Sequence, residues 1–163
     1  MQQRETPAVH HGDSPAACSD LAAGTAAEHL VCADLLLAGY RAFFAAQICP
    51  YDVAVEVGGL IRIQVKSTRV LRPMPQRVTP VTAYLFYTRK AGKGGKRVYQ
   101  VGDFDMFALV ALDIRVIAYI PAHKIIRQTI QLKPPGAREW KGRKLPGIDK
   151  YPFCSALAEL QHG

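Results

Sequence analysis

Hydrophobic and polar residues alternate between residues 60 and 68. An extended chain would carry apolar side chains on one face (Ile61, Ile63, Val65) and polar side chains on the other (Arg62, Gln64, Lys66). This period of two is typical of a β-strand, and a second segment rich in β-branched residues, 53–57, precedes it. The glycine pair 58–59 separates the two segments, so the pattern predicts a β-hairpin.

Two pairings of this hairpin are open, and they bring different residues together. A loop made of the two glycines alone would pair Asp52 with Val65 and turn the carboxylate away from Lys66. A three-residue loop over 57–59 would pair Asp52 with Gln64. Directly opposed residues share a face of the sheet, so Asp52, Gln64 and Lys66 would then converge. We expect the three-residue loop.

The rest of the chain predicts further helices and strands. Apolar residues recur at helical spacing from Ser19 to Ala38, with Ser19 as N-cap and Gly39 as the left-handed residue that ends the helix. Strands are predicted over 41–48, 82–88, 104–112 and 115–120, and helices over 121–127 and 151–161. Segments 70–80 and 133–150 are rich in proline, glycine and basic residues, so we expect loops there.

Composition limits the kind of protein. The 163 residues are enough for one domain with its own core, and the formal net charge of +8 favours an anionic partner. Residues 1–17 lack periodicity and are expected to form a flexible tail before a single domain over 18–163. No apolar run approaches the roughly 20 residues of a membrane helix. We therefore expect a cytoplasmic protein that does not associate with membranes.

The predicted hairpin carries the strongest candidate chemistry. It would place the carboxylate of Asp52, the amide oxygen of Gln64 and the ammonium of Lys66 on one wet face, with the main-chain carbonyl of Val65 as a further oxygen. Oxygen donors with few carboxylates suit Mg²⁺, which keeps several of its waters. The four cysteines contain no CxxC pair and indicate neither a zinc site nor a disulfide framework.

These residues resemble a known motif. Pro50 and Asp52, followed by Gln64-Val65-Lys66, are similar to the two halves of the PD-(D/E)XK nuclease motif, in a QxK variant with Gln64 where an acid is usual. The strand 63–68 after a glycine turn resembles the group I intron homing endonuclease branch of that superfamily. The resemblance implies an α/β fold with a restriction-endonuclease-like core, in which helices flank a mixed central β-sheet.

Glu28 enters through the same resemblance. By its position alone, Glu28 reads as a solvated residue near the middle of a helix. However, the run from Gly24 to Glu28 and the leucines before Gly39 resemble the first helix of the superfamily, whose acidic residue leans towards the metal. The resemblance thus implies a catalytic set of Glu28, Asp52, Gln64 and Lys66, and a metal site of Asp52, Gln64, Val65 and Glu28. The metal would be Mg²⁺, with Mn²⁺ as an alternative.

The implied activity is metal-dependent hydrolysis of phosphodiester bonds in double-stranded DNA. One site cuts one strand, so we expect a homo-oligomer. Two other readings stay open: a structure-selective enzyme similar to Holliday-junction resolvases, and a catalytically silent DNA-binding protein, because Gln64 replaces an acid.

Basic residues in the predicted loops are candidates for contact with the DNA backbone. An ordinary solvated surface is the alternative for each of them. The candidates lie after the hairpin, in a glycine-rich basic turn and near Trp140, and are Arg69, Arg72, Arg77, Lys93, Lys96, Arg97, Arg138, Lys141, Arg143 and Lys144. Asp103 and Asp105 precede an apolar strand, where carboxylates usually cap a turn, so neither is assigned to the catalytic set.

Overall fold

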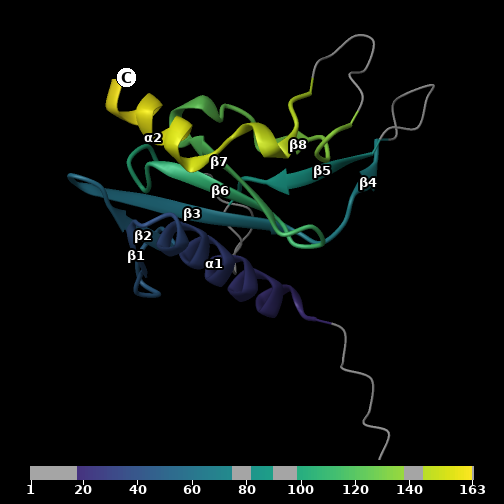
Figure 1. Ribbon diagram of the computed structural model, residues 1–163. Coiled ribbons are helices and arrows are strands. Elements are labelled where there is room, and N and C mark those ends of the chain that lie inside the picture. Colours follow the sequence, from purple (N-terminus) through teal and green to yellow (C-terminus); the bar gives the residue numbers. More distant parts are fainter. Residues whose placement is uncertain (1–17, 75–81, 90–98, 138–144, 163) are drawn as a thin grey trace, which may run out of the picture.

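The computed structural model describes residues 18–74, 82–89, 99–137 and 145–162 (Figure 1). The predicted tail over 1–17 lies outside these ranges. The centre is a five-stranded sheet in the order β1-β2-β3-β6-β7. Its strands are β1 (Arg41–Phe44), β2 (Val53–Glu56), β3 (Leu60–Thr68), β6 (Met106–Ala111) and β7 (Val116–Pro121). β3 and β6 run parallel and the other neighbours antiparallel, so the predicted mixed sheet is confirmed.

Other elements cover both faces of this sheet. Helix α1 (Asp20–Leu37) packs across β1, β2 and β3, and α2 (Phe153–His162) packs against β7. A second sheet, β4-β5-β8, lies on the other side (Figure 1). It consists of β4 (Arg72–Pro73), β5 (Thr82–Tyr87) and β8 (Thr129–Leu132). Two hydrophobic clusters result, one between the central sheet and the helices and one between the two sheets.

The first helix follows its sequence signals. The Ser19 side chain accepts a hydrogen bond from the Ala22 amide at 3.1 Å, and Gly39 ends the helix with a φ of +88°. One stripe of the helix, recurring every four residues, is buried against the sheet: Ala23, Ala27, Val31 and Leu35. The small residues at the start of this stripe let α1 approach the sheet closely.

The hairpin register is the one expected from a three-residue loop. Glu56 pairs with Leu60 and Val53 with Ile63, so Val57, Gly58 and Gly59 form the turn. Gly58 has a φ of +66°, a conformation that residues with a side chain adopt at a cost. Asp52, directly before β2, consequently lies beside the segment of β3 that contains Gln64.

Three predictions of local structure are wrong in part. The first strand ends at Phe44 and not at residue 48, because the chain turns there towards Asp52. The predicted helix over 121–127 is a single 3₁₀ turn, η1 (Ala122–Lys124), followed by the unpredicted strand β8. Segments predicted as loops contain β4 and a second 3₁₀ turn, η2 (Ile148–Lys150). Within the described ranges, no helix is long and apolar enough to span a membrane.

The two glycines of the turn make a matched pair of substitutions. A Cβ added at either position would meet no atom within 4 Å, but only Gly58 has a positive φ. We expect Gly58→Ala to lower the free energy of unfolding by about 1 kcal/mol, because of its left-handed backbone. Gly59→Ala should leave it unchanged or slightly raised. Urea unfolding of the two variants measures the difference, and equal effects would contradict the assigned turn.

Candidate active site

The carboxylate of Asp52 is held against the peptide between Gln64 and Val65. Its Oδ2 accepts a hydrogen bond from the main-chain N–H of Val65 at 2.7 Å and another from the side-chain Nε2 of Gln64. That amide nitrogen also lies 3.4 Å from the carbonyl oxygen of Val65. The predicted convergence of Asp52 and Gln64 is therefore present.

The setting differs from the wet face expected for these residues. Gln64 is only 7% exposed, so its amide is a buried polar group that needs partners. Its nitrogen, and not the oxygen expected to bind metal, is directed at Asp52. A half-turn of the amide about its last side-chain torsion would exchange the two atoms and present the oxygen instead.

Burial also changes the acidity of Asp52. Loss of solvation raises the pKa of this carboxyl group above its ordinary value, although the amide of Val65, the charge of Lys66 and the amide of Gln64 each act in the opposite direction. The ionised form is thus disfavoured until a further positive charge approaches the carboxylate.

Glu28 comes from α1 to the same place. It lines, with Asp52, Thr25 and Tyr51, a hollow of about 400 Å³ between the helix and the segment that leads into β2. Burial, followed by the negative charge of Asp52, raises the pKa of Glu28, and His29 partly offsets this effect. The two carboxyl groups are therefore close enough to repel each other when both are ionised.

Lys66 completes the set of predicted residues. Its charge lowers the pKa of Asp52, which places the ammonium within electrostatic reach of the carboxylate. Its Nζ donates a hydrogen bond to the hydroxyl of Tyr99 at 2.7 Å. Tyr99 was not predicted from the sequence.

The donors gathered here fit a hard divalent cation. They are the carboxylates of Glu28 and Asp52, the amide of Gln64 and the carbonyl of Val65, all of which offer oxygen. A cation between the two carboxylates would offset the charge of Asp52, which adds to burial in raising the pKa of Glu28. Within the described ranges, no group of three or more His, Cys, Asp or Glu side chains is placed to hold a metal ion.

Comparisons with known proteins decide the family. Residues 19–154 match the sequence model of the PD-(D/E)XK endonuclease family. The chain belongs to this family. Its fold is also similar to the solved structure of a bacterial homing endonuclease, I-Ssp6803I, with a TM-score of 0.65 and 21% sequence identity over 89% of this chain and 95% of the other. A search of curated proteins finds no match.

Family membership confirms the resemblance inferred from Asp52, Gln64 and Lys66, together with the α/β core that it implied. PD-(D/E)XK nucleases use divalent metals in general, in agreement with the oxygen donors described above. The likeness to the homing endonuclease, at 21% identity, concerns the fold.

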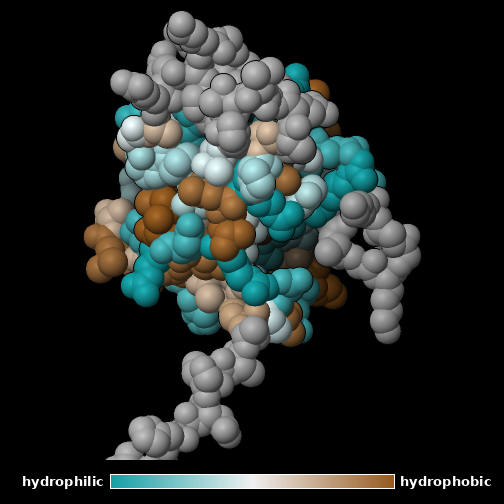
Figure 2. Space-filling model, turned by 90° about the vertical axis from the view of Figure 1, so that its right-hand side faces the viewer, coloured by the Kyte–Doolittle hydropathy of each residue, from teal (hydrophilic) through white to brown (hydrophobic). Residues whose placement is uncertain are grey.

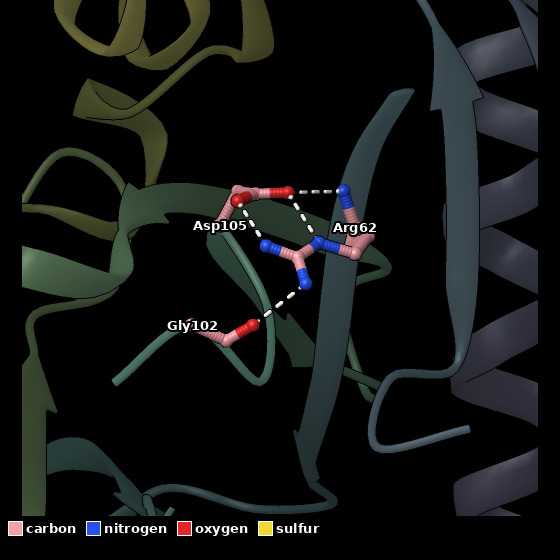
Figure 3. A network of polar contacts seen from close by, with 3 residues as sticks. All are labelled: Arg62, Gly102 and Asp105. Carbon is pink, nitrogen blue, oxygen red and sulfur yellow. Dashed lines mark hydrogen bonds and ion pairs between the residues drawn. The ribbon is translucent and has the colours of Figure 1, made fainter. Parts of the chain in front are cut away.

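The endonuclease contains a second polar network beside the site, which sequence reasoning missed (Figure 3). The Arg62 guanidinium donates hydrogen bonds to both carboxylate oxygens of Asp105, at 3.0 and 2.8 Å, and to the carbonyl of Gly102 at 2.6 Å. The main-chain N–H of Arg62 also donates to Asp105 at 2.8 Å. Burial alone would raise the pKa of Asp105, but the contacts with Arg62 hold it below its ordinary value.

This network corrects one expectation about the acids before β6. Asp103 does cap a turn, because its carboxylate accepts a hydrogen bond from the Gln100 N–H at 3.0 Å. Asp105 instead forms an ion pair across to β3. The signal available from sequence was an arginine on the polar face of the active-site strand, but nothing local identified its partner 43 residues later.

Two of the candidate DNA-binding residues lie in the described ranges. Arg69 forms an ion pair with Asp20 and donates to the carbonyl of Cys18 at 2.6 Å, so it connects the end of β3 to the start of α1. Arg72 is exposed in β4. The others lie outside the described residues: Arg77, Lys93, Lys96, Arg97, Arg138, Lys141, Arg143 and Lys144.

The raised pKa of Asp52 gives a testable dependence of stability on pH. A carboxyl group whose pKa is raised by folding makes the folded protein less stable as pH rises from the ordinary pKa to the raised one. The side chain of Asp52→Asn cannot ionise. In the presence of a chelator, the stability of this variant relative to wild type should therefore rise from acid to neutral pH. Urea unfolding at both pH values checks this. Glu56→Gln, at the exposed end of β2, is the control. An Asp52→Asn variant that is less stable relative to wild type at neutral pH than at acid pH would contradict the prediction.

Proposed function

We propose that this endonuclease hydrolyses phosphodiester bonds of double-stranded DNA with Mg²⁺, at the site formed by Glu28, Asp52, Gln64 and Lys66. The observation that carries the proposal is the position of Asp52 on the Gln64–Val65 peptide, with an ammonium and a second carboxylate beside it. The net charge of +8 supports a polyanionic substrate.

Four groups would hold the cation. Asp52 and Glu28 would supply negatively charged oxygens, and Gln64 and the carbonyl of Val65 would supply neutral ones. A bound divalent cation contributes Lewis acidity towards the phosphate oxygens. Because Gln64 is neutral, the site carries one negative charge fewer than the usual motif and should bind its metal less tightly. Mn²⁺ would fit the same donors.

Lys66 would supply the positive charge of the protein itself. Its ammonium would orient the attacking water and stabilise the extra negative charge that develops on the phosphate as the new P–O bond forms and the bond to the leaving oxygen breaks. A preorganised charge is most effective in a partly buried site, where water screens it least. Lys66 is half-buried here.

The substrate and the assembly are further parts of the proposal. A double-strand break needs two copies of a single-strand active site, so we propose a homo-oligomer. A contiguous hydrophobic patch on the surface supports self-association, whereas single exposed side chains such as Leu37, Ile48 and Ile126 do not. Figure 2 shows hydrophobic residues gathered in the middle of one face, with hydrophilic residues around them.

Replacement of either Asp52 or Lys66 should separate DNA binding from cleavage. Asp52→Ala should abolish cutting by loss of the main metal ligand, and Lys66→Ala should slow it about 100-fold or more, since the transition state then lacks its cation. Both variants should still bind DNA. Nicking of supercoiled plasmid with and without Mg²⁺, beside a gel-shift assay, provides the measurement. Full activity in Lys66→Ala would refute its assignment.

The substrate set of this assay distinguishes the remaining readings. Linear, supercoiled and four-way DNA should all be included. Cutting that follows base sequence supports a homing-type enzyme, whereas cutting confined to branched DNA supports a resolvase-like one. DNA binding without metal and without any nicking would favour the catalytically silent reading suggested by Gln64.

Gln64→Glu tests the neutral ligand directly. A carboxylate at this position restores the usual charge of the motif, so the dissociation constant for Mg²⁺ should fall. In the absence of metal it would add a third buried negative charge beside Asp52, and the variant should unfold at lower temperature than wild type. Thermal unfolding over a Mg²⁺ titration reports both effects. Gln131→Glu in β8 is the matched control, and equal shifts in the two variants would count against a metal at Gln64.

A further inference from the structure

Tyr99 makes two contacts with the ammonium of Lys66. Its hydroxyl oxygen accepts the hydrogen bond from Nζ at 2.7 Å, and Nζ also lies 5.1 Å from the centre of the ring. A hydrogen bond to a charged donor is stronger than one between neutral groups, and an aromatic ring near a cation adds a smaller attraction. Both contacts favour one position of the lysine side chain.

The ring of Tyr99 is itself held in place beside the active-site strand. It packs edge to face against Phe104, with centroids 4.9 Å apart, and against Phe107 at 6.0 Å. Both phenylalanines are buried, and Phe107 is the residue of β6 that pairs with Gln64. Tyr99 therefore rests on the neighbouring strand at the level of the proposed metal ligands.

The loop that follows Tyr99 is fixed to the same strand. Arg62 binds Gly102 within this loop and Asp105 at its end, as Figure 3 shows. Gly102 has a φ of +92°, so the turn needs glycine there. Arg62 precedes Lys66 by four residues on β3. Strand β3 thus carries both Lys66 and Arg62, the arginine that anchors the loop of Tyr99.

We propose that Tyr99 is a positioning residue, which holds the Lys66 ammonium in the active site, and that the Arg62–Asp105 pair fixes the loop that carries it. The inference rests on the proposed function, since the role of Lys66 in cleavage comes from there. The inference adds Tyr99, a residue outside the predicted catalytic set, which lies on a loop that follows this set in the chain.

The charges around this contact explain why a neutral acceptor is useful. Asp52 faces both Lys66 and Tyr99, Asp103 adds a carboxylate on the loop side, and Glu28 faces Asp52 from α1. Burial, with the charges of Asp52 and Asp103, raises the pKa of Tyr99, so the hydroxyl stays neutral. An ammonium drawn fully onto Asp52 would compete with the cation for its oxygens. Tyr99 offers Nζ an acceptor without neutralising its charge.

Tyr99→Phe tests the contact, because it removes the hydroxyl and keeps the ring that packs on Phe104. We expect unchanged DNA binding and a single-turnover cleavage rate about tenfold lower, the loss typical of a hydrogen bond to a charged group. Tyr84→Phe, which removes a tyrosine hydroxyl bonded to Asp113 at 3.0 Å, is the matched control and should change neither.

A second measurement does not depend on cutting. In protein labelled with ¹³C-lysine, the Cε signal of Lys66, assigned by its absence in Lys66→Ala, should be narrower at neutral pH in Tyr99→Phe than in wild type, because the ammonium is no longer held in one position. Arg62→Lys keeps the charge but loses the forked contact with Asp105, and should narrow the signal in the same way. If wild type cuts no DNA, the proposed function fails while this line width still decides the contact. An unchanged cleavage rate or an unchanged line width in Tyr99→Phe overturns the inference.

Discussion

Asp52 reaches its partners because the chain reverses over three residues between β2 and β3. With Glu56 opposite Leu60, the strand before the turn delivers its first carboxylate to the Val65 N–H and the Gln64 amide. A slip of one residue would turn every side chain of β3 to the opposite face of the sheet. Ile63 and Val65 would then leave the cluster below α1. The hydrophobic core and the active site therefore require the same register, and packing of the core secures the site.

The position of β3 at the centre of the fold has an electrostatic consequence. A central strand covered on both sides shields its polar residues from water, and Gln64 is accordingly buried. Desolvation then raises the pKa of Asp52, and repulsion between Asp52 and Glu28 adds to the effect in the helix. Such a site is held together by the sheet and not by the attraction of its own charges. A bound cation would relieve that unfavourable arrangement.

Local patterns predicted the parts of this fold that depend on neighbouring residues. Ser19 and Gly39 mark the ends of α1 by their own chemistry, and the alternation along β3 together with the glycine turn predicted the pairing of Asp52. Contacts between distant segments were not predictable in the same way. The partner of Arg62 lies beyond an excursion through β4 and β5, and the strand β8 forms only because β5 offers it an edge. Tyr99 follows a glycine-rich basic turn, and its sequence context gives no sign that it meets Lys66.

The two neutral residues of the site, Gln64 and Tyr99, both affect which partner the Lys66 ammonium takes. In the usual motif an additional carboxylate would pair with the lysine and with the metal, and one negative charge would serve both. Here Gln64 takes the place of that acid and offers only a dipole, so Lys66 would be drawn towards Asp52, the remaining acid of the hairpin. The hydroxyl of Tyr99, which stays protonated, gives the ammonium another partner. A neutral Gln64 on β3 and a tyrosine from a separate loop are thus compatible with each other: in the proposed mechanism the lysine would keep its full charge for the phosphate, and Asp52 would keep its oxygens for the cation.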